Sequence, residues 1–324
     1  MKIRFWGVQG STPNPLTTAH LQAKIKEVLR RAQGRPFQTE RDFQNFFEEL
    51  PFPLTHTTGG NTTCFEILSE RGARLIVDMG SGARKLGLNM MAGEVADGKA
   101  TIPILMTHFH LDHLLGFPFF RPAYVPGNKV KFYAGHNYMK AALTGITHPY
   151  YFPVRLQEMD AEITFEYLNE GRRFSIGDFQ VACKRLHHPG DSFAYRITEG
   201  DKSRVIATDA EYKELDAESL QPYVEFYRNA NLLVFDAQYT LKDVFQKMDW
   251  GHSSSFIGVD ISLLANVSKL VLTHHDPSYN DEKMTDILEK TEAFKREALK
   301  QSREKLPAAR LDVMMAYEGL ELSV

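Results

Sequence analysis

The chain has 324 residues, of which 43% are hydrophobic and 24% charged, a composition that excludes a disordered or fibrous protein. The net charge of -3, from 38 basic and 41 acidic residues, lacks the basic excess of an electrostatic nucleic-acid binder. No apolar run approaches the ~20 residues of a membrane span, and the first residues are typical of a strand and not of a signal peptide. We therefore expect a cytoplasmic protein that contacts no membrane.

The two cysteines, Cys64 and Cys183, are too few for a disulfide scaffold or a cysteine-rich zinc site. We expect both to be small buried apolar residues. The 12 histidines are the unusual feature of the composition, because they cluster along the chain.

A helical insertion follows the first predicted strand, which covers residues 3–6. Apolar residues recur at helical spacing in two stretches on either side of residues 34–36. The first stripe consists of Leu21, Ile25, Val28 and Leu29, and the second of Phe43, Phe46, Phe47 and Leu50. The two helices form an insertion at about 16–56. We expect their stripes to pack on the body of the protein, with a lid or a dimer contact as the alternatives.

Several further apolar runs are typical of buried strands, and each ends at a polar residue. The runs cover residues 75–77, 102–106, 179–186, 205–207, 232–235 and 270–272. The Asp and His residues that follow them are Asp78, His108, His187, His188, Asp209, Asp236 and His274. In layered α/β folds, sites are built at the carboxyl ends of strands. So many Asp and His residues at strand ends indicate one shared site.

The C-terminal part contains one more predicted helix and one more strand. The helix carries apolar residues at helical spacing from Met284 to Ala298, and Pro307 ends its region. A closing strand is expected over residues 311–316.

The strongest chemical signal is the segment HFHLDH at residues 108–113. His108 and His110 lie two residues apart, so an extended strand end points both side chains the same way. Asp112 and His113 follow on a turn and can face a second ion. Four clustered ionisable groups would be costly without a cation, so the segment predicts a metal site. Zinc suits the imidazoles, with manganese or iron as alternatives.

The remaining metal ligands are expected at other strand ends. His187 with His188, and His274 with His275, each offer one ligand and one neighbour that packs or hydrogen bonds. Asp209 offers a carboxylate that can bridge two metals. Two divalent ions ~3.5–4 Å apart would share a hydroxide, lower its pKa and stabilise an in-line displacement at phosphorus.

These motifs resemble those of the metallo-β-lactamase superfamily of hydrolases. The matching segments are 7–13, 59–64, 78–82, 108–113, 188–190, 195–196, 208–209, 236–240, 251–253 and 273–274. The resemblance covers nearly the whole chain apart from the insertion. It implies an α/β fold, a four-layer αββα sandwich, in a single domain over 1–324. The sequence is most similar to the phosphodiesterase branch, which includes tRNase Z, the phosphonate-operon cyclic phosphodiesterases and the bacterial cyclic-nucleotide phosphodiesterases.

The resemblance also implies a ligand set, residue by residue. One metal is expected on His108, His110 and His188, and the other on Asp112, His113 and His274, with Asp209 bridging. The resemblance selects His188 because the family ligand directly precedes Pro-Gly. It selects His274 because the family ligand follows Thr at a strand end.

The resemblance implies catalytic roles for Asp112 and His252. His252, in Gly-His-Ser, matches a histidine that contacts the scissile phosphate in the nuclease branch, where it is a candidate acid for the leaving oxygen. We consider Glu211 as the group that orients His252.

Other polar residues near the motifs are expected to have supporting roles. Asn61 and Asp78 are expected to fix loops around the site, and Asp236 is expected to be structural. The remaining histidines expected on the surface or in loops are His20, His56, His136 and His148.

The expected function is hydrolysis of a small phosphodiester, above all a 3′,5′-cyclic nucleotide, by attack of a metal-bound hydroxide. The cofactors are two divalent metal ions, with zinc expected first. The insertion would limit substrate size without supplying a catalytic group. The expected partner is a small-molecule substrate and not a nucleic acid, and a homodimer is left open.

Several alternatives share the metal motif. A lactone or other ester hydrolase could use the same site, although the segments 236–240 and 251–253 oppose that assignment. A tRNA 3′-processing nuclease is opposed by the slightly acidic charge and by the lack of a Gly/Pro-rich arm. A diiron redox enzyme would carry an acidic residue at the position of His110. A non-catalytic binding module would have lost some of the ligands.

Overall fold

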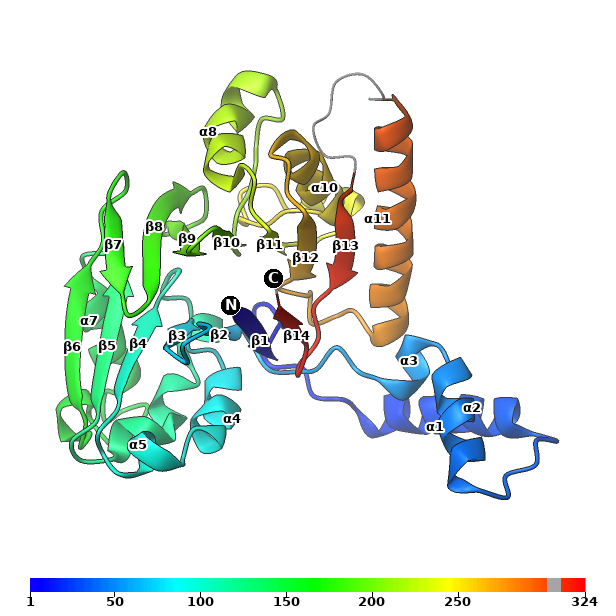
Figure 1. Cartoon of the computed structure of the whole chain (residues 1–324), viewed down its shortest axis with the longest axis horizontal. Coiled ribbons are helices and arrows are strands. Elements are labelled where there is room, and N and C mark those ends of the chain that lie inside the picture. The colour runs from blue at the N-terminus through cyan, green and yellow to red at the C-terminus, as the bar shows by residue number, and fades with distance from the viewer. Residues whose placement is uncertain (302–309, 324) are drawn as a thin grey trace.

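Two seven-stranded sheets packed face to face form the centre of the protein, in a computed structural model that describes residues 1–301 and 310–323 (Figure 1). The first sheet has the order β14-β1-β2-β3-β4-β5-β6. Its strands are β1 (Lys2–Gly7), β2 (Cys64–Leu68), β3 (Arg74–Val77), β4 (Thr101–Leu105), β5 (Lys129–Ala134), β6 (Glu162–Tyr167) and β14 (Glu321–Ser323). The second sheet has the order β13-β12-β11-β10-β9-β8-β7. Its strands are β7 (Arg173–Ile176), β8 (Phe179–Leu186), β9 (Ser192–Glu199), β10 (Lys202–Ala207), β11 (Leu232–Asp236), β12 (Lys269–Thr273) and β13 (Asp312–Met315).

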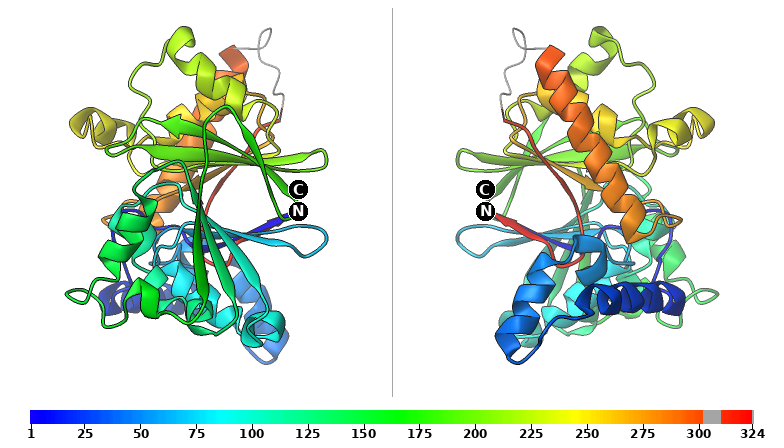
Figure 2. Two further views of the ribbon diagram at one scale, coloured as in Figure 1. Left: turned by 90° about the vertical axis from the view of Figure 1, so that its left-hand side faces the viewer. Right: turned by 90° about the vertical axis from the view of Figure 1, so that its right-hand side faces the viewer.

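Helices cover the outer face of each sheet, so that the layers run helix, sheet, sheet, helix (Figure 2). The helices on the first sheet are α4 (Gly82–Asn89), α5 (Gly93–Ala96) and α7 (Met139–Ile146). Those on the second sheet are α8 (Ala217–Tyr227), α10 (Ser255–Leu264) and α11 (Asp281–Gln301). A third apolar core lies between the sheets and includes Phe5 and Val77 from one sheet and Val181 and Ile206 from the other. This arrangement confirms the predicted αββα sandwich.

The strand directions bring several strand ends to one region of the molecule. In the first sheet β3, β4, β5 and β6 run parallel, and in the second β10, β11, β12 and β13 do. Strand β8 shares the direction of β10, because both are antiparallel to β9. The carboxyl ends of parallel strands lie at the same edge of a sheet, which is where ligands bind in open α/β folds.

Most of the predicted elements are present, with one error at the C-terminal end. The predicted strands correspond to β1, β3, β4, β8, β10, β11 and β12, and Cys64 and Cys183 are buried. The strand expected to close the chain is β13, but β14 follows it and pairs antiparallel with β1. Pro307 lies outside the described residues. No helix of the described chain is both long and apolar enough to cross a bilayer.

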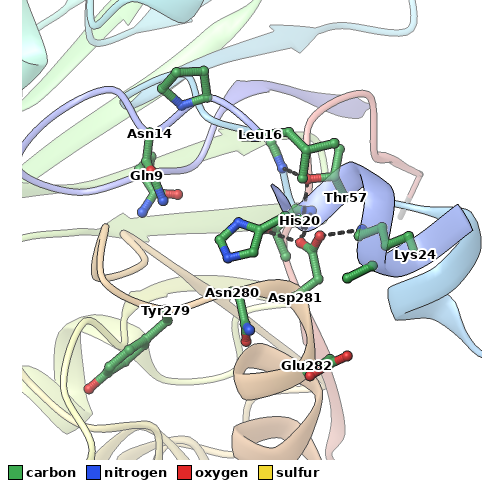
Figure 3. Close-up of a pocket in the computed structure, with 14 residues that line it drawn as sticks. Gln9, Asn14, Leu16, His20, Lys24, Thr57, Tyr279, Asn280, Asp281 and Glu282 are labelled. Atoms are coloured by element: carbon green, nitrogen blue, oxygen red, sulfur yellow. Dashed lines mark hydrogen bonds and ion pairs between the residues drawn. The ribbon is translucent and has the colours of Figure 1, made fainter. Parts of the chain in front are cut away.

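The insertion contains α1 (Thr18–Ala32), α2 (Glu40–Glu49) and α3 (Phe52–Thr55), and it projects from the sandwich (Figure 1). Its attachment is partly polar: Lys24 of α1 reaches Asp281 at the start of α11, with 2.5 Å between Nζ and Oδ2 (Figure 3). It is also partly aromatic, because the ring of Phe52 in α3 lies 5.3 Å from that of Tyr317. Thr58 donates its backbone N–H to the other oxygen of Asp281 at 2.8 Å. A cavity of about 120 Å³ lies at this junction. The expectation that the α1 stripe packs on the body is wrong, because no residue of α1 is buried.

Candidate metal centre

The predicted metal-ligand residues come from four strand ends and meet in one cluster. His108 and His110 follow β4, and Asp112 and His113 lie in the short helix α6 (Leu111–Leu114) directly after them. The other three follow β8, β10 and β12, and they are His188, Asp209 and His274. The parallel halves of the two sheets therefore bring together residues that lie more than 160 positions apart.

The first group consists of His108, His110 and His188, whose nearest ligand atoms all lie within 4.8 Å of one another. The Nε2 atom of His188 lies 3.0 Å from Nδ1 of His110. The Oδ1 atom of Asp209 lies 3.8 Å from Nε2 of His108 and 4.0 Å from Nε2 of His188. This group has the three imidazoles and the neighbouring carboxylate that suit a divalent transition metal.

The second group consists of Asp112, His113, Asp209 and His274, again with ligand atoms within 4.8 Å. The Nε2 atom of His274 lies 3.2 Å from Asp112 Oδ2 and 3.1 Å from Asp209 Oδ1. The Nε2 atom of His113 lies 3.3 Å from Asp209 Oδ2. Asp209 thus stands beside both groups, which is the position that a bridging carboxylate requires.

Two buried ligand-type atoms in the cluster, His108 Nε2 and Asp209 Oδ2, have no hydrogen-bond partner among the described residues. A buried polar atom without a partner is costly, and a buried charge more so. A divalent cation would give both atoms a partner. Such ions accept imidazole and carboxylate ligands, and the cluster offers three imidazoles on one side and two carboxylates on the other. The residues of this cluster therefore fit divalent metal ions.

The ring nitrogens that face away from the cluster are held by specific hydrogen-bond partners. Nδ1 of His113 lies 2.9 Å from Asp78 Oδ2, and Nδ1 of His188 lies 2.9 Å from the Gly251 carbonyl oxygen. Nδ1 of His274 lies 2.9 Å from Oε1 of Gln238. Such partners place the proton on Nδ1 and present Nε2 to the centre, and they orient metal ligands in known sites.

The backbone at this edge adopts unusual conformations. Asp78, Asp209 and His274 have φ angles of 60°, 57° and 60°, in the left-handed region that side chains other than glycine rarely adopt. Each such residue costs on the order of 1–3 kcal/mol. Gly251 has a φ of 85°, and a Cβ there would come within 2.2 Å of His188 Nδ1, so a side chain would displace that ring. Strained residues therefore surround the cluster and hold its geometry.

The histidines of the cluster have opposite pKa shifts. Burial lowers the pKa of His108 well below its usual value and that of His188 to about 4. Burial would also lower the pKa of His274, but the carboxylates of Asp209 and Asp112 outweigh it and raise that pKa to about 9. The pKa of His113 is raised for the same reason. Without a metal, the carboxylates of the second group are thus balanced by protonated imidazoles.

These shifts predict how the stability of the metal-free protein depends on pH. The folded-state pKa of His274, about 9, lies above the ~6.5 of an unfolded chain. Its contribution to stability is therefore full below pH ~6.5 and is lost as the pH rises through about 9. We expect the Tm of chelator-treated protein to fall over this range and that of metal-loaded protein to fall less, because a cation replaces the proton. Differential scanning fluorimetry measures the Tm of both samples as a function of pH. His274→Gln should reduce the fall in Tm, whereas His148→Gln, the control at an exposed histidine, should not. Equal slopes in all samples would contradict the assignment.

His252 lies beside the cluster and is oriented by Asp236. Its Nδ1 lies 2.8 Å from Asp236 Oδ2, and a ring nitrogen lies within 4.8 Å of ligand atoms of His188 and Asp209. The rings of His252 and His274 stack with centroids 5.0 Å apart. The expectation that Glu211 orients His252 is wrong: Glu211 accepts hydrogen bonds from the backbone N–H groups of Asp249 and Gly251 and so holds the loop before His252.

Asp236 is the residue of this site whose contact with His252 the sequence interpretation missed. It ends β11 and also accepts the backbone N–H groups of Ala210 and Gln238, so the structural role expected for it is present as well. The signal in the sequence was its position at a strand end, which it shares with the candidate ligands Asp209 and His274. What the sequence did not show was the loop that returns His252 to this strand end.

The remaining predicted residues lie around the cluster. Asp78 accepts the backbone N–H and the hydroxyl of Thr107, both at 2.7 Å, and so fixes the loop that carries His108. Asn61 bonds Ser81 and Glu318 and fixes a neighbouring loop. Among the four histidines expected on the surface or in loops, His20, His56 and His148 are exposed, whereas the loop residue His136 is buried.

The two histidine pairs are resolved by burial and by hydrogen bonding. His187 is exposed and lies near Glu211 and Asp249, while His188 is in the cluster. His275 is buried and donates its Nε2–H to the Ala316 carbonyl oxygen at 2.8 Å, whereas His274 is in the cluster. Each pair therefore has one member in the cluster and one outside it.

This difference predicts the metal content of four variants. His188→Ala and His274→Ala should lose bound metal, because each removes a ligand atom from the cluster. His187→Ala and His275→Ala should retain it, although His275→Ala also leaves a cavity in the core and should lower the Tm. Inductively coupled plasma mass spectrometry of protein at equal concentration measures metal per chain. Equal losses within a pair would show that the assignment is shifted by one residue.

Comparison with known proteins gives the family. The family model described as Beta-lactamase superfamily domain matches residues 74–275, which include all seven candidate ligands. Ribonuclease Z of Bacillus cereus (strain AH187) is 25% identical over 277 residues, covering 69% of this chain and 85% of that protein. The metallo-beta-lactamase fold protein YhfI from Bacillus subtilis has a TM-score of 0.62 at 15% identity, covering 99% and 98% of the two chains. Yeast PDE1 has a TM-score of 0.63 at 13% identity, covering 100% and 99%. The chain therefore belongs to the β-lactamase superfamily, as a hydrolase with the metallo-β-lactamase fold.

Proposed function

We propose that this protein is a metal-dependent phosphodiesterase that hydrolyses a small phosphodiester, with a 3′,5′-cyclic nucleotide as the proposed substrate. The observation that carries the proposal is the His252–Asp236 pair beside the two ligand groups. A positioned proton donor next to a metal cluster is what cleavage of an alkoxide ester of phosphate requires.

The proposed cofactors are two divalent ions, zinc first, held by the two groups with Asp209 between them. Bound there, such ions lower the pKa of a water molecule to near neutrality and polarise phosphoryl oxygens. The residues of the chain prepare this site: Asp78, the Gly251 carbonyl and Gln238 orient three imidazoles with Nε2 toward the centre. Ser11 donates its backbone N–H to Asp112 Oδ2 at 2.9 Å and holds that carboxylate in place.

The proposed role of His252 follows from its hydrogen bond. Asp236 holds Nδ1, which leaves Nε2 to interact with a phosphate oxygen or to give its proton to the departing alkoxide. Asp112 is proposed to act with the ligand groups, where it stands 3.2 Å from His274 and 3.3 Å from His113.

The preference for a small substrate rests on charge. The chain carries a net charge of -3, whereas affinity for a polynucleotide is dominated by basic residues that neutralise phosphates. Ribonuclease Z is nevertheless among the relatives by sequence, so a tRNA-type substrate is the competitor that an experiment should include.

A substrate panel tests the proposal. Protein loaded with zinc, manganese or iron is assayed on bis-p-nitrophenyl phosphate, 3′,5′-cyclic AMP, a precursor tRNA, a lactone and a β-lactam chromophore. We expect turnover of the two small diesters, its loss with a chelator and its return with metal. Asp209→Ala purified in the same way controls for contaminating phosphatases. Hydrolysis of the lactone alone, or cleavage of the tRNA alone, would refute the proposed substrate class.

A further inference from the structure

The helical insertion exposes an apolar surface that the body of the protein does not cover. The described residues include 18 large apolar or aromatic side chains that are exposed, and six of them fall within residues 16–47. They are Leu16, Leu21, Ile25, Leu29, Phe43 and Phe47. A third of the exposed large side chains thus lies on about a tenth of the chain, on a part that projects from the sandwich (Figure 1). Such a concentration of exposed apolar surface marks an interaction site in most proteins.

The exposed side chains form one row on each helix. Leu21, Ile25 and Leu29 stand at four-residue spacing on α1 and are 46%, 49% and 64% exposed. Phe43 and Phe47 stand at the same spacing on α2 and are 43% and 50% exposed. Residues four apart lie above one another on a helix, so each row is a continuous ridge.

The contacts that hold the insertion to the body use side chains outside the two ridges. On α1 the attachment is Lys24, which pairs with Asp281 of α11 (Figure 3). On α3 it is Phe52, whose ring centroid lies 5.3 Å from that of Tyr317. Inside the insertion, Phe37 packs against the buried Phe46 and stacks on Phe43 with centroids 4.8 Å apart, and Phe43 remains 43% exposed. A lid that closed over a substrate would need its apolar side to face the metal cluster. No hydrogen bond or ion pair of the described structure joins residues 16–56 to the seven candidate ligands.

The two helices carry opposite charge beside their ridges. Helix α1 has four basic residues and one acidic residue, and α2 has four acidic residues and one basic residue. In the row next to the α1 ridge are Lys26 and Arg30, and in the row next to the α2 ridge are Glu40 and Glu48, all exposed. When a twofold axis relates two copies, the basic row of each copy can face the acidic row of the other, so the two surfaces are complementary in charge.

We propose that the insertion is a homodimer interface in which α1 of one copy packs against α2 of the other, with the apolar ridges in contact and the basic row facing the acidic row. A twofold arrangement makes this contact twice. The proposal goes beyond the hydrolytic function and does not depend on it. The alternative occupant is an anionic membrane surface, to which a basic amphipathic helix such as α1 can bind. The acidic side chains of α2 disfavour that alternative, because an anionic surface would repel them.

The size of the surface predicts the strength of the dimer. Helices of 15 and 10 residues are about 22 Å and 15 Å long, and a helix is about 10 Å wide, so each copy can cover roughly 400 Å². A standard stable interface covers about 800 Å² per partner. We therefore expect a reversible dimer with a Kd on the order of micromolar, populated at tens of micromolar protein.

Charge reversal tests both the dimer and its arrangement. One variant carries Lys26→Glu with Arg30→Glu, and the other carries Glu40→Lys with Glu48→Lys. Each variant alone would place like charges at both contacts and should weaken association by at least tenfold. A mixture of the two should form a heterodimer, because its two contacts then pair opposite charges. Analytical ultracentrifugation from about 1 to 200 μM measures each sample.

Further samples separate the proposal from its competitors. Ile25→Asp with Phe47→Asp should give a monomer at all concentrations, whereas Leu88→Asp, at a leucine of α4 that is 53% exposed, should behave as the wild type. Circular dichroism and Tm establish that each variant is folded. A wild-type monomer at every concentration, or a dimer that both reversals leave unchanged, would overturn the proposal. The proposal would also be overturned if the wild type were monomeric and floated with phosphatidylserine vesicles, and if the variant with reversed charge on α1 no longer floated with them.

Discussion

Asp209→Asn is expected to reduce the metal content from two ions per chain to one or none and to lower phosphodiester turnover about 10³-fold or more. The carboxylate of Asp209 lies 3.1 Å from His274, 3.3 Å from His113 and 3.8 Å from His108, so both ligand groups lose a donor at once. Asparagine is the informative substitution because it tolerates the left-handed conformation that Asp209 adopts, with a φ of 57°. Loss of the charge is thereby separated from loss of the backbone geometry.

The comparison variants for Asp209 define the measurement. Asp209→Ala should behave as Asp209→Asn in metal content but should have a lower Tm, because alanine is strained at this φ. Asp201→Ala, at an exposed aspartate in the turn before β10, should retain both ions. Elemental analysis and turnover of bis-p-nitrophenyl phosphate are measured on the same preparations. A wild type that saturates with one ion, together with full occupancy in Asp209→Ala, would rule out a bridging role.

His252→Ala is expected to slow hydrolysis of a cyclic nucleotide by roughly 10²–10⁴-fold, the usual contribution of a general acid. An alkoxide is a poor leaving group and needs a proton as the P–O bond breaks, whereas p-nitrophenolate hardly does. The same variant should therefore slow bis-p-nitrophenyl phosphate much less. Its metal content should be unchanged, because each ligand group is complete without His252.

Asp236 provides a second test of the same role. Asp236→Asn keeps a hydrogen-bond acceptor for His252 Nδ1 but removes the charge, so it should reduce cyclic-nucleotide turnover in the same direction and by less than His252→Ala. Equal losses on both substrates would indicate that His252 binds or orients the substrate, and no loss on either would make it a packed loop histidine.

The sequence by itself determined the fold class and most of the candidate metal centre. Short buried strands and amphipathic helices are local patterns, so β4, β10, β12 and α11 could be predicted from a few consecutive residues. The HFHLDH segment is also local: four ligand-type side chains within six residues are close in space whatever the rest of the chain does. The resemblance to the metallo-β-lactamase superfamily then supplied the three distant candidates, His188, Asp209 and His274.

The tertiary structure decided the partners of these residues and the environment of the insertion. The pairing of His252 with Asp236 depends on how the segment between them, which includes α9 (Leu241–Gln246), returns to the end of β11. No local pattern encodes that return. The orientation of His188 likewise depends on Gly251, 63 positions away. The stripe of α1 has the periodicity of a packed helix, but burial is a property of the surroundings and not of the helix. Because Lys24 and Asp281 attach this helix by its polar side, its apolar ridge faces solvent.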